Sequence, residues 1–166
     1  MLRILILILA VLAGASPAFA QNAKPAAVSS VGPWESVIWV RGGKVERCTL
    51  SRAKPLADGT SYGFLIDREV LFGVDQPKWK FPANARLQPV LTPSSGGGAK
   101  VVAESVAPTR ANITMPRAML DDLQKSEHLD VEIAGSKTRL PFDDFNAARV
   151  VLEICVQKIG KAYQPG

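Results

Sequence analysis

The chain has 166 residues, of which 20 are Lys or Arg and 15 are Asp or Glu, so its formal charge is +5. Its length suits one domain with its own core, and a hydrophobic content of 47% excludes a disordered or collagen-like chain. One histidine and two cysteines are too few for a structural zinc site with four Cys or His ligands. The positive charge is modest and acidic residues are interspersed, so the sequence does not predict a nucleic-acid partner.

The first 20 residues have the pattern of a secretory signal peptide. Arg3 supplies a positive start, residues 4–15 form an apolar run, and residues 18–20 place small side chains at the −3 and −1 positions of a cleavage site. The alternative is a transmembrane anchor, but the uncharged stretch of 17 residues is at the lower limit for crossing a bilayer. We therefore expect cleavage near Ala20, a periplasmic or secreted protein, and no transmembrane segment after cleavage.

Residues 21–33 are small and polar and include two prolines, which predicts a flexible lead-in to a single globular, β-rich domain over residues 34–166. In this domain, short runs of apolar and β-branched residues are separated by turn residues, which favours antiparallel strands because parallel pairs need long crossovers. Helical spacing occurs in residues 116–126 and 144–159, where Asp143 is the expected cap of the second helix. The expected strands cover residues 34–41, 44–53, 61–67, 69–74, 86–91, 100–106, 110–114, 128–134 and 137–141.

These elements predict an α+β fold. We expect an antiparallel β-sandwich or a curled sheet of about seven to nine strands, with the short helix and the C-terminal helix packed on it. A Gly-Gly pair at residues 42–43 predicts that the first two strands form a hairpin.

The two cysteines are expected to form one disulfide bond, because an even pair in an exported protein is usually oxidised. Cys48 lies on the predicted core face of its strand, and Cys155 lies on the apolar stripe of the last helix. The bond would close a loop of about 107 residues and contribute about 4 to 5 kcal/mol on the chain-entropy model. Reduced core thiols and a disulfide to a partner are the alternatives.

Catalytic motifs are sparse. His128 is the only histidine, and the enzymatic alternative is a small periplasmic hydrolase that uses His128 with carboxylates. The neighbouring acids Asp121 and Asp122, and Asp143 and Asp144, are explained by exposed or helix-capping positions, and the spacing of a calcium loop is absent. The sequence therefore predicts no catalytic residue set, no metal site and no cofactor.

The most suggestive surface segment is Lys78-Trp79-Lys80-Phe81, where two cations alternate with two aromatic residues in a proline-bounded loop. This composition suits contact with a protein partner or an anionic surface of the cell envelope. The alternative is that Trp79 and Phe81 are buried under the loop while the two lysines are solvated.

Several features together resemble small exported bacterial proteins of the invasion-associated locus B family. The matching positions are Trp34, Cys48, Met-Leu-Asp-Asp-Leu at 119–123, Leu-Pro-Phe at 140–142 and Phe-Asn-Ala-Ala at 145–148. The chain lacks the further cysteines of that family, and Cys155 lies beyond the family's usual end. The resemblance implies an exported β-rich domain without established enzymatic chemistry, so we expect a non-enzymatic exported binding or accessory protein.

Overall fold

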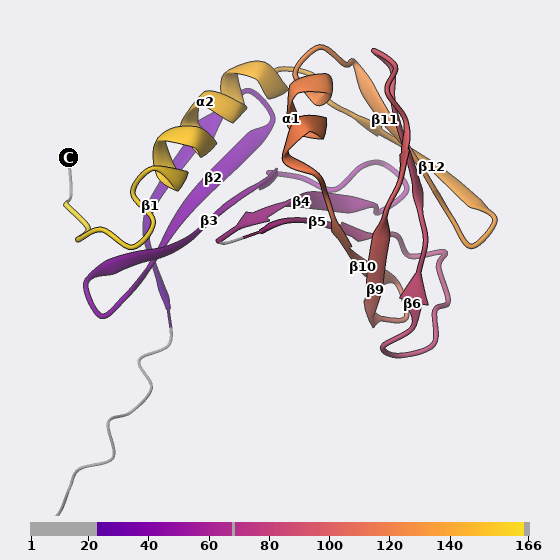
Figure 1. Ribbon diagram of the computed structural model, residues 1–166, viewed down its shortest axis with the longest axis horizontal. Helices are drawn as coiled ribbons and strands as arrows, with labels where there is room; N and C mark the ends of the chain where they lie inside the picture. Colours follow the sequence, from indigo (N-terminus) through magenta and orange to yellow (C-terminus); the bar gives the residue numbers. More distant parts are fainter. Residues whose placement is uncertain (1–22, 68, 165–166) are drawn as a thin grey trace, which may run out of the picture.

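The computed structural model describes residues 23–67 and 69–164, so the predicted signal peptide lies outside the described residues. Within these ranges the chain forms twelve strands in two antiparallel sheets and two helices, an α+β fold dominated by β structure (Figure 1). The strands are β1 (Lys24–Val31), β2 (Trp34–Arg41), β3 (Lys44–Arg52), β4 (Ser61–Ile66), β5 (Val70–Asp75), β6 (Arg86–Leu87), β7 (Val90–Pro93), β8 (Ala99–Lys100), β9 (Val102–Ala107), β10 (Arg110–Thr114), β11 (His128–Ile133) and β12 (Ser136–Pro141). The helices are α1 (Arg117–Leu123) and α2 (Phe145–Val156).

The larger sheet has eight strands in the order β1-β2-β3-β4-β5-β10-β9-β6, and the smaller has four in the order β12-β11-β7-β8. Figure 1 shows the eight-stranded sheet bending into an arch, with α2 lying over β2 and β3 on its outer side. Inward-facing residues of both sheets and both helices belong to one core cluster. The opposite, concave face of the large sheet is left uncovered by either helix.

The expectation of a flexible lead-in at residues 21–33 was wrong for most of that segment. Residues 24–31 form β1, which pairs antiparallel with β2 along its whole length. The side chains of β1 are small and mostly exposed, so the sequence shows no alternation of apolar and polar residues that would predict a strand. The strand is stabilised by main-chain pairing at a sheet edge rather than by an apolar face.

The disulfide prediction is confirmed. Cys48 on β3 and Cys155 on α2 are bonded across a sequence separation of 107 residues, with their Cα atoms 6.1 Å apart. Both cysteines are buried, so the bond holds α2 against the centre of the large sheet.

The start of α2 is organised differently from the expected cap. Asp144, in the left-handed backbone region at φ 57°, occupies the N-cap position, and its side chain makes no capping hydrogen bond. Asp143 instead accepts a hydrogen bond from the indole Nε1 of Trp34 at its carbonyl oxygen, 2.8 Å away, and its carboxylate pairs with Arg52 at 2.9 Å. The residues before α2 therefore connect the helix to the hairpin of β2 and β3.

Candidate functional site

The segment Lys78–Phe81 is not the exposed aromatic surface that we considered. Trp79 is 3% exposed and Phe81 is 8% exposed, with their ring centroids 5.0 Å apart, and only the two lysines reach solvent. The Trp79 indole donates a hydrogen bond to the Ser136 hydroxyl at the turn between β11 and β12. Burial of Trp79 removes the amphipathic contact on which the predicted surface depended.

A polar cluster at the preceding turn explains why this loop folds inward. Gln76 is buried, and its side-chain amide donates to Thr60 and Asp58 while its oxygen accepts from the backbone of Lys78. Hydrogen bonds from Thr60, and then from Gln76, lower the pKa of Asp58 to about 2. This cluster fixes the chain just before Trp79 and directs its indole toward the core.

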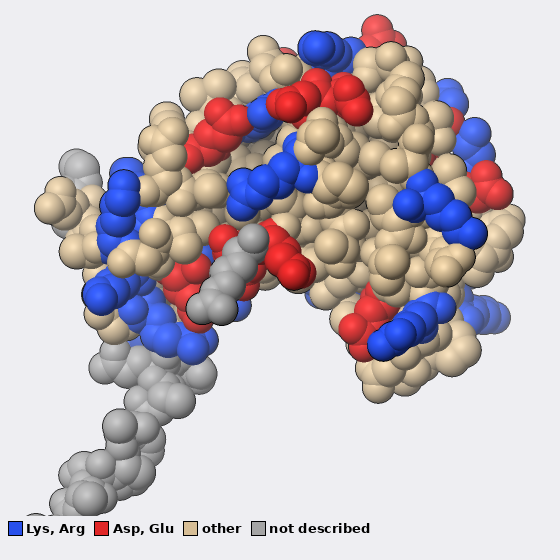
Figure 2. Space-filling model, in the orientation of Figure 1, with Lys and Arg blue, Asp and Glu red and all other residues tan. Residues whose placement is uncertain are grey.

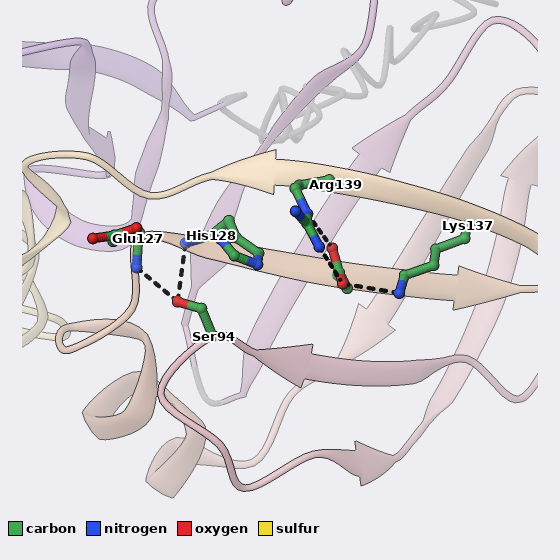
Figure 3. A network of polar contacts seen from close by, with 6 residues as sticks. Ser94, Glu127, His128, Lys137 and Arg139 are labelled. Carbon is green, nitrogen blue, oxygen red and sulfur yellow. Dashed lines mark hydrogen bonds and ion pairs between the residues drawn. The ribbon is translucent and has the colours of Figure 1, made fainter.

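His128 opens β11, with its backbone N–H donating to the Ser94 hydroxyl (Figure 3). The carboxylate nearest along its strand is Asp130, which is already engaged by Arg139 through two hydrogen bonds of 2.8 and 3.0 Å and by Lys137 at 3.0 Å. The hydrogen bonds from Arg139 hold the pKa of Asp130 well below its usual range. Asp130 is therefore already committed to two cations, while the Ser94 hydroxyl accepts hydrogen bonds from the backbone N–H groups of Glu127 and His128.

One cavity lies on the concave face of the large sheet and has a volume of about 400 Å³, and two larger cavities of about 560 and 510 Å³ lie beside the helices. In the view of Figure 2 the molecule is hollowed at the bottom, and charged groups of both signs lie at the rims of the hollow. Gly63 on β4 and Gly73 on β5 stand directly opposite each other in the strand register and form the floor of the cavity. Two neighbouring glycines leave the sheet without side chains at this point, so a ligand can approach its backbone closely.

Glycine occupies these two positions for different structural reasons. A Cβ atom at Gly63 would lie 2.6 Å from the Cβ of Ser51, so the close approach of β3 requires glycine there. A Cβ atom at Gly73 would lie 3.5 Å from the Asn112 Oδ1, 3.8 Å from the Arg110 Nη2 and 3.9 Å from the Gly63 carbonyl oxygen, which are ordinary contacts. Packing therefore does not require glycine at position 73, and its absent side chain is what keeps the cavity open.

Polar side chains with no protein partner surround this floor. Asp75, Arg110 and Asn112 line the cavity, and none of these three side chains has a hydrogen bond or ion pair within the described part of the chain. Asp75 and Arg110 face each other in the pairing of β5 with β10, yet they form no salt bridge. Asp75 and Asn112 are half-buried, so their free hydrogen-bonding capacity is concentrated inside the hollow.

An apolar row runs beside the polar one. Leu65 on β4 and Leu71 on β5 are paired in the register and half-buried in the cavity, with Thr49 beside them on β3. The Thr49 hydroxyl accepts a hydrogen bond from the indole Nε1 of Trp39, whose ring lies under the guanidinium of Arg47, 4.9 Å from the ring centroid. The cavity therefore combines free polar groups on one side with an apolar surface on the other, the usual character of a small-ligand site.

Sequence reasoning missed this site because its parts are far apart in the chain. Asn112 and Gly73 are neighbours only through the pairing of β10 with β5, which skips four intervening strands along the sequence. The available signal was the repeated isolated glycine inside two predicted strands, a pattern that marks close approach of a backbone or a ligand.

Within the described ranges, no group of three or more His, Cys, Asp or Glu side chains is arranged to hold a metal ion. Neither described helix has the length and apolar composition needed to cross a lipid bilayer.

Comparison with known proteins identifies a likeness of fold. No protein-family model matches the chain, and no curated protein matches its sequence. Among solved structures, the crystal structure of invasion associated protein B from Bartonella henselae superposes with a TM-score of 0.58 at 13% sequence identity. The match covers 80% of this chain and 98% of that chain. The predicted resemblance to proteins of the invasion-associated locus B type is thus confirmed at the level of architecture.

Proposed function

We propose that the protein is an exported, non-enzymatic binding or accessory protein of the bacterial periplasm or the extracellular space. Its ligand site is the concave face of the eight-stranded sheet, defined by Gly63, Gly73, Asp75, Arg110 and Asn112. This site replaces the segment at residues 78–81 as the contact surface of the protein.

The observation that carries this proposal is the set of uncommitted polar side chains around a bare floor. Three other arginines of the described residues are paired: Arg139 with Asp130, Arg149 with acids on both helices, and Arg52, which also lines the cavity, with Asp143. Free polar groups that converge in a cavity gain hydrogen bonds when a ligand enters, whereas paired groups must first lose a partner.

Export is supported by the pattern of residues 1–20 and by the disulfide, a bond that persists in oxidising compartments. The full chain can be expressed in a Gram-negative host and the protein recovered from the periplasm. Its intact mass should be that of a chain beginning at Gln21, less two hydrogens relative to the reduced form. A cytoplasmic protein that keeps residues 1–20 would contradict export.

Filling the cavity with Gly73→Leu should abolish ligand binding without unfolding the protein. The Cβ atom of the leucine would meet Asn112 and Arg110 at ordinary contact distances, and the rest of its side chain would occupy the floor on which a ligand rests. Replacing glycine inside a strand also removes a source of instability, by about 0.5 to 1 kcal/mol on the alanine scale. The measurement is a calorimetric titration of each protein with a panel of oligosaccharides, short peptides and phospholipid headgroups.

The matched control is Val106→Leu, which enlarges an exposed apolar side chain of β9 outside the cavity. We expect wild-type affinities for the control and no binding by Gly73→Leu. Equal affinities for all three proteins, or a panel without one binder, would contradict the proposed site.

A further inference from the structure

We infer that the ligand of the concave face is a neutral oligosaccharide, an inference that rests on the proposed function of this face. Three properties of the cavity support it: its balanced charge, its mixture of donors and acceptors, and the apolar row beside them.

Three charged side chains line the cavity, and because Arg52 is already paired with Asp143, Asp75 and Arg110 are the two that have no partner within the described part of the chain. Asp75 and Arg110 are directly paired across β5 and β10 without a salt bridge, and both line the same hollow. An anionic ligand would be attracted by the guanidinium and repelled by the carboxylate, and a cationic ligand would experience the reverse. A ligand without net charge uses both groups at no such cost.

The hydrogen-bonding groups require a ligand that both donates and accepts. The Arg110 guanidinium only donates, the Asp75 carboxylate only accepts, and the Asn112 amide does both. The hydroxyls of Ser51 and Ser61, which also line the cavity, can donate or accept. Sugar hydroxyls have the same double capacity, so a glycan can satisfy every member of this set, whereas an apolar ligand would leave them buried without partners.

The apolar row fits the other surface of a sugar. A pyranose ring presents C–H groups on its face and hydroxyls at its edge, so its face can rest on Leu65 and Leu71 while its hydroxyls reach the polar row. The missing side chain at Gly73 allows the ring to lie against the sheet itself, whereas the corresponding space at Gly63 is taken by Ser51.

An extended peptide is the main competing ligand, and the geometry disfavours it. Peptides usually join a sheet at an edge, where unpaired main-chain groups can extend the hydrogen-bond ladder. The cavity lies over β3, β4, β5 and β10, which are interior strands whose main chains are paired on both sides. The concave face therefore offers side chains rather than a free backbone edge.

The test uses the full mature protein and three neutral probes: cellohexaose, maltohexaose and chitohexaose. Asp75→Asn and Arg110→Gln remove opposite charges, and both should weaken the binding of the same hexasaccharide by about tenfold, because each removes a hydrogen bond to a charged group. Glu132→Gln and Lys100→Gln make the same charge changes on exposed residues of the four-stranded sheet outside the cavity, and these controls should keep the wild-type affinity.

The outcomes separate this inference from the proposed function. If Asp75→Asn strengthens and Arg110→Gln weakens the binding of an anionic phospholipid headgroup from the panel described above, an anionic ligand occupies the site, and the oligosaccharide assignment is overturned while the site stands. Binding of a neutral peptide but of no hexasaccharide has the same consequence, as does failure of every hexasaccharide to bind. If a hexasaccharide binds equally well to Gly73→Leu, both the inference and the proposed site are wrong.

Discussion

Replacing both cysteines, in the variant Cys48→Ala/Cys155→Ala, should lower the free energy of unfolding by about 4 to 5 kcal/mol. The disulfide closes a loop of 107 residues, so its loss restores a large conformational entropy to the unfolded chain. It also releases α2 from β3, where both cysteines are buried. The measurement is equilibrium unfolding in urea.

The wild-type protein under reducing conditions is the matched control for this effect. Its unfolding free energy should fall by a similar amount, while the double alanine variant should be insensitive to the reductant. A variant as stable as the oxidised protein would show that the native contacts of α2, and not the covalent link, hold the helix on the sheet.

The variant Trp34→Ala should cost about 3 to 5 kcal/mol, the range for removing a large aromatic side chain from a core. Trp34 is fully buried, and four aromatic rings surround it at centroid distances of 5.3 to 6.5 Å. Its indole also donates the hydrogen bond to Asp143 that fastens the start of α2 to the first hairpin. One substitution therefore opens a cavity and leaves a carbonyl oxygen without its partner.

Trp39→Ala provides the comparison, because Trp39 lies on the same strand and is half-buried on the concave face. Its loss should cost clearly less than that of Trp34 in the same urea experiment. A Trp39 variant that is as destabilised as the Trp34 variant would contradict the placement of the aromatic cluster at the centre of the core.

Local signals in the sequence predicted the hairpin of β2 and β3 and both helices. Glycines at residues 42–43, where both backbones have positive φ, mark the turn between β2 and β3, and the apolar stripe of residues 145–155 marks the buried face of α2. The pairing of Cys48 with Cys155 followed from their predicted core faces and from the expected compartment. Each of these features depends on residues close in the sequence or on a chemical rule for one residue type.

The features that escaped prediction depend on contacts between distant segments. The edge strand β1 has no apolar face, and Trp79 is buried because Gln76 and Ser136 hold its loop against the core. The concave site forms where β4, β5 and β10 come into register, and no local pattern specifies that Gly63, Gly73 and Asn112 lie in one row. The structure also has more strands than expected, because β1 was not predicted and the strands expected at 86–91 and 100–106 are each divided in two, with one part in each sheet: β6 and β7, and β8 and β9.

The most direct test of the concave ligand site is to map amide chemical shifts of the nitrogen-15-labelled mature protein during titration with a bound hexasaccharide. We predict that the largest changes occur at Gly63, Gly73 and Asn112, with smaller changes at Leu65 and Leu71, because these residues form the floor and walls of the cavity. Changes concentrated instead at residues 78–81, or at the cavity lined by Arg117 and Leu120 of α1 and by Arg149 and Leu152 of α2, would place the ligand elsewhere and contradict the account.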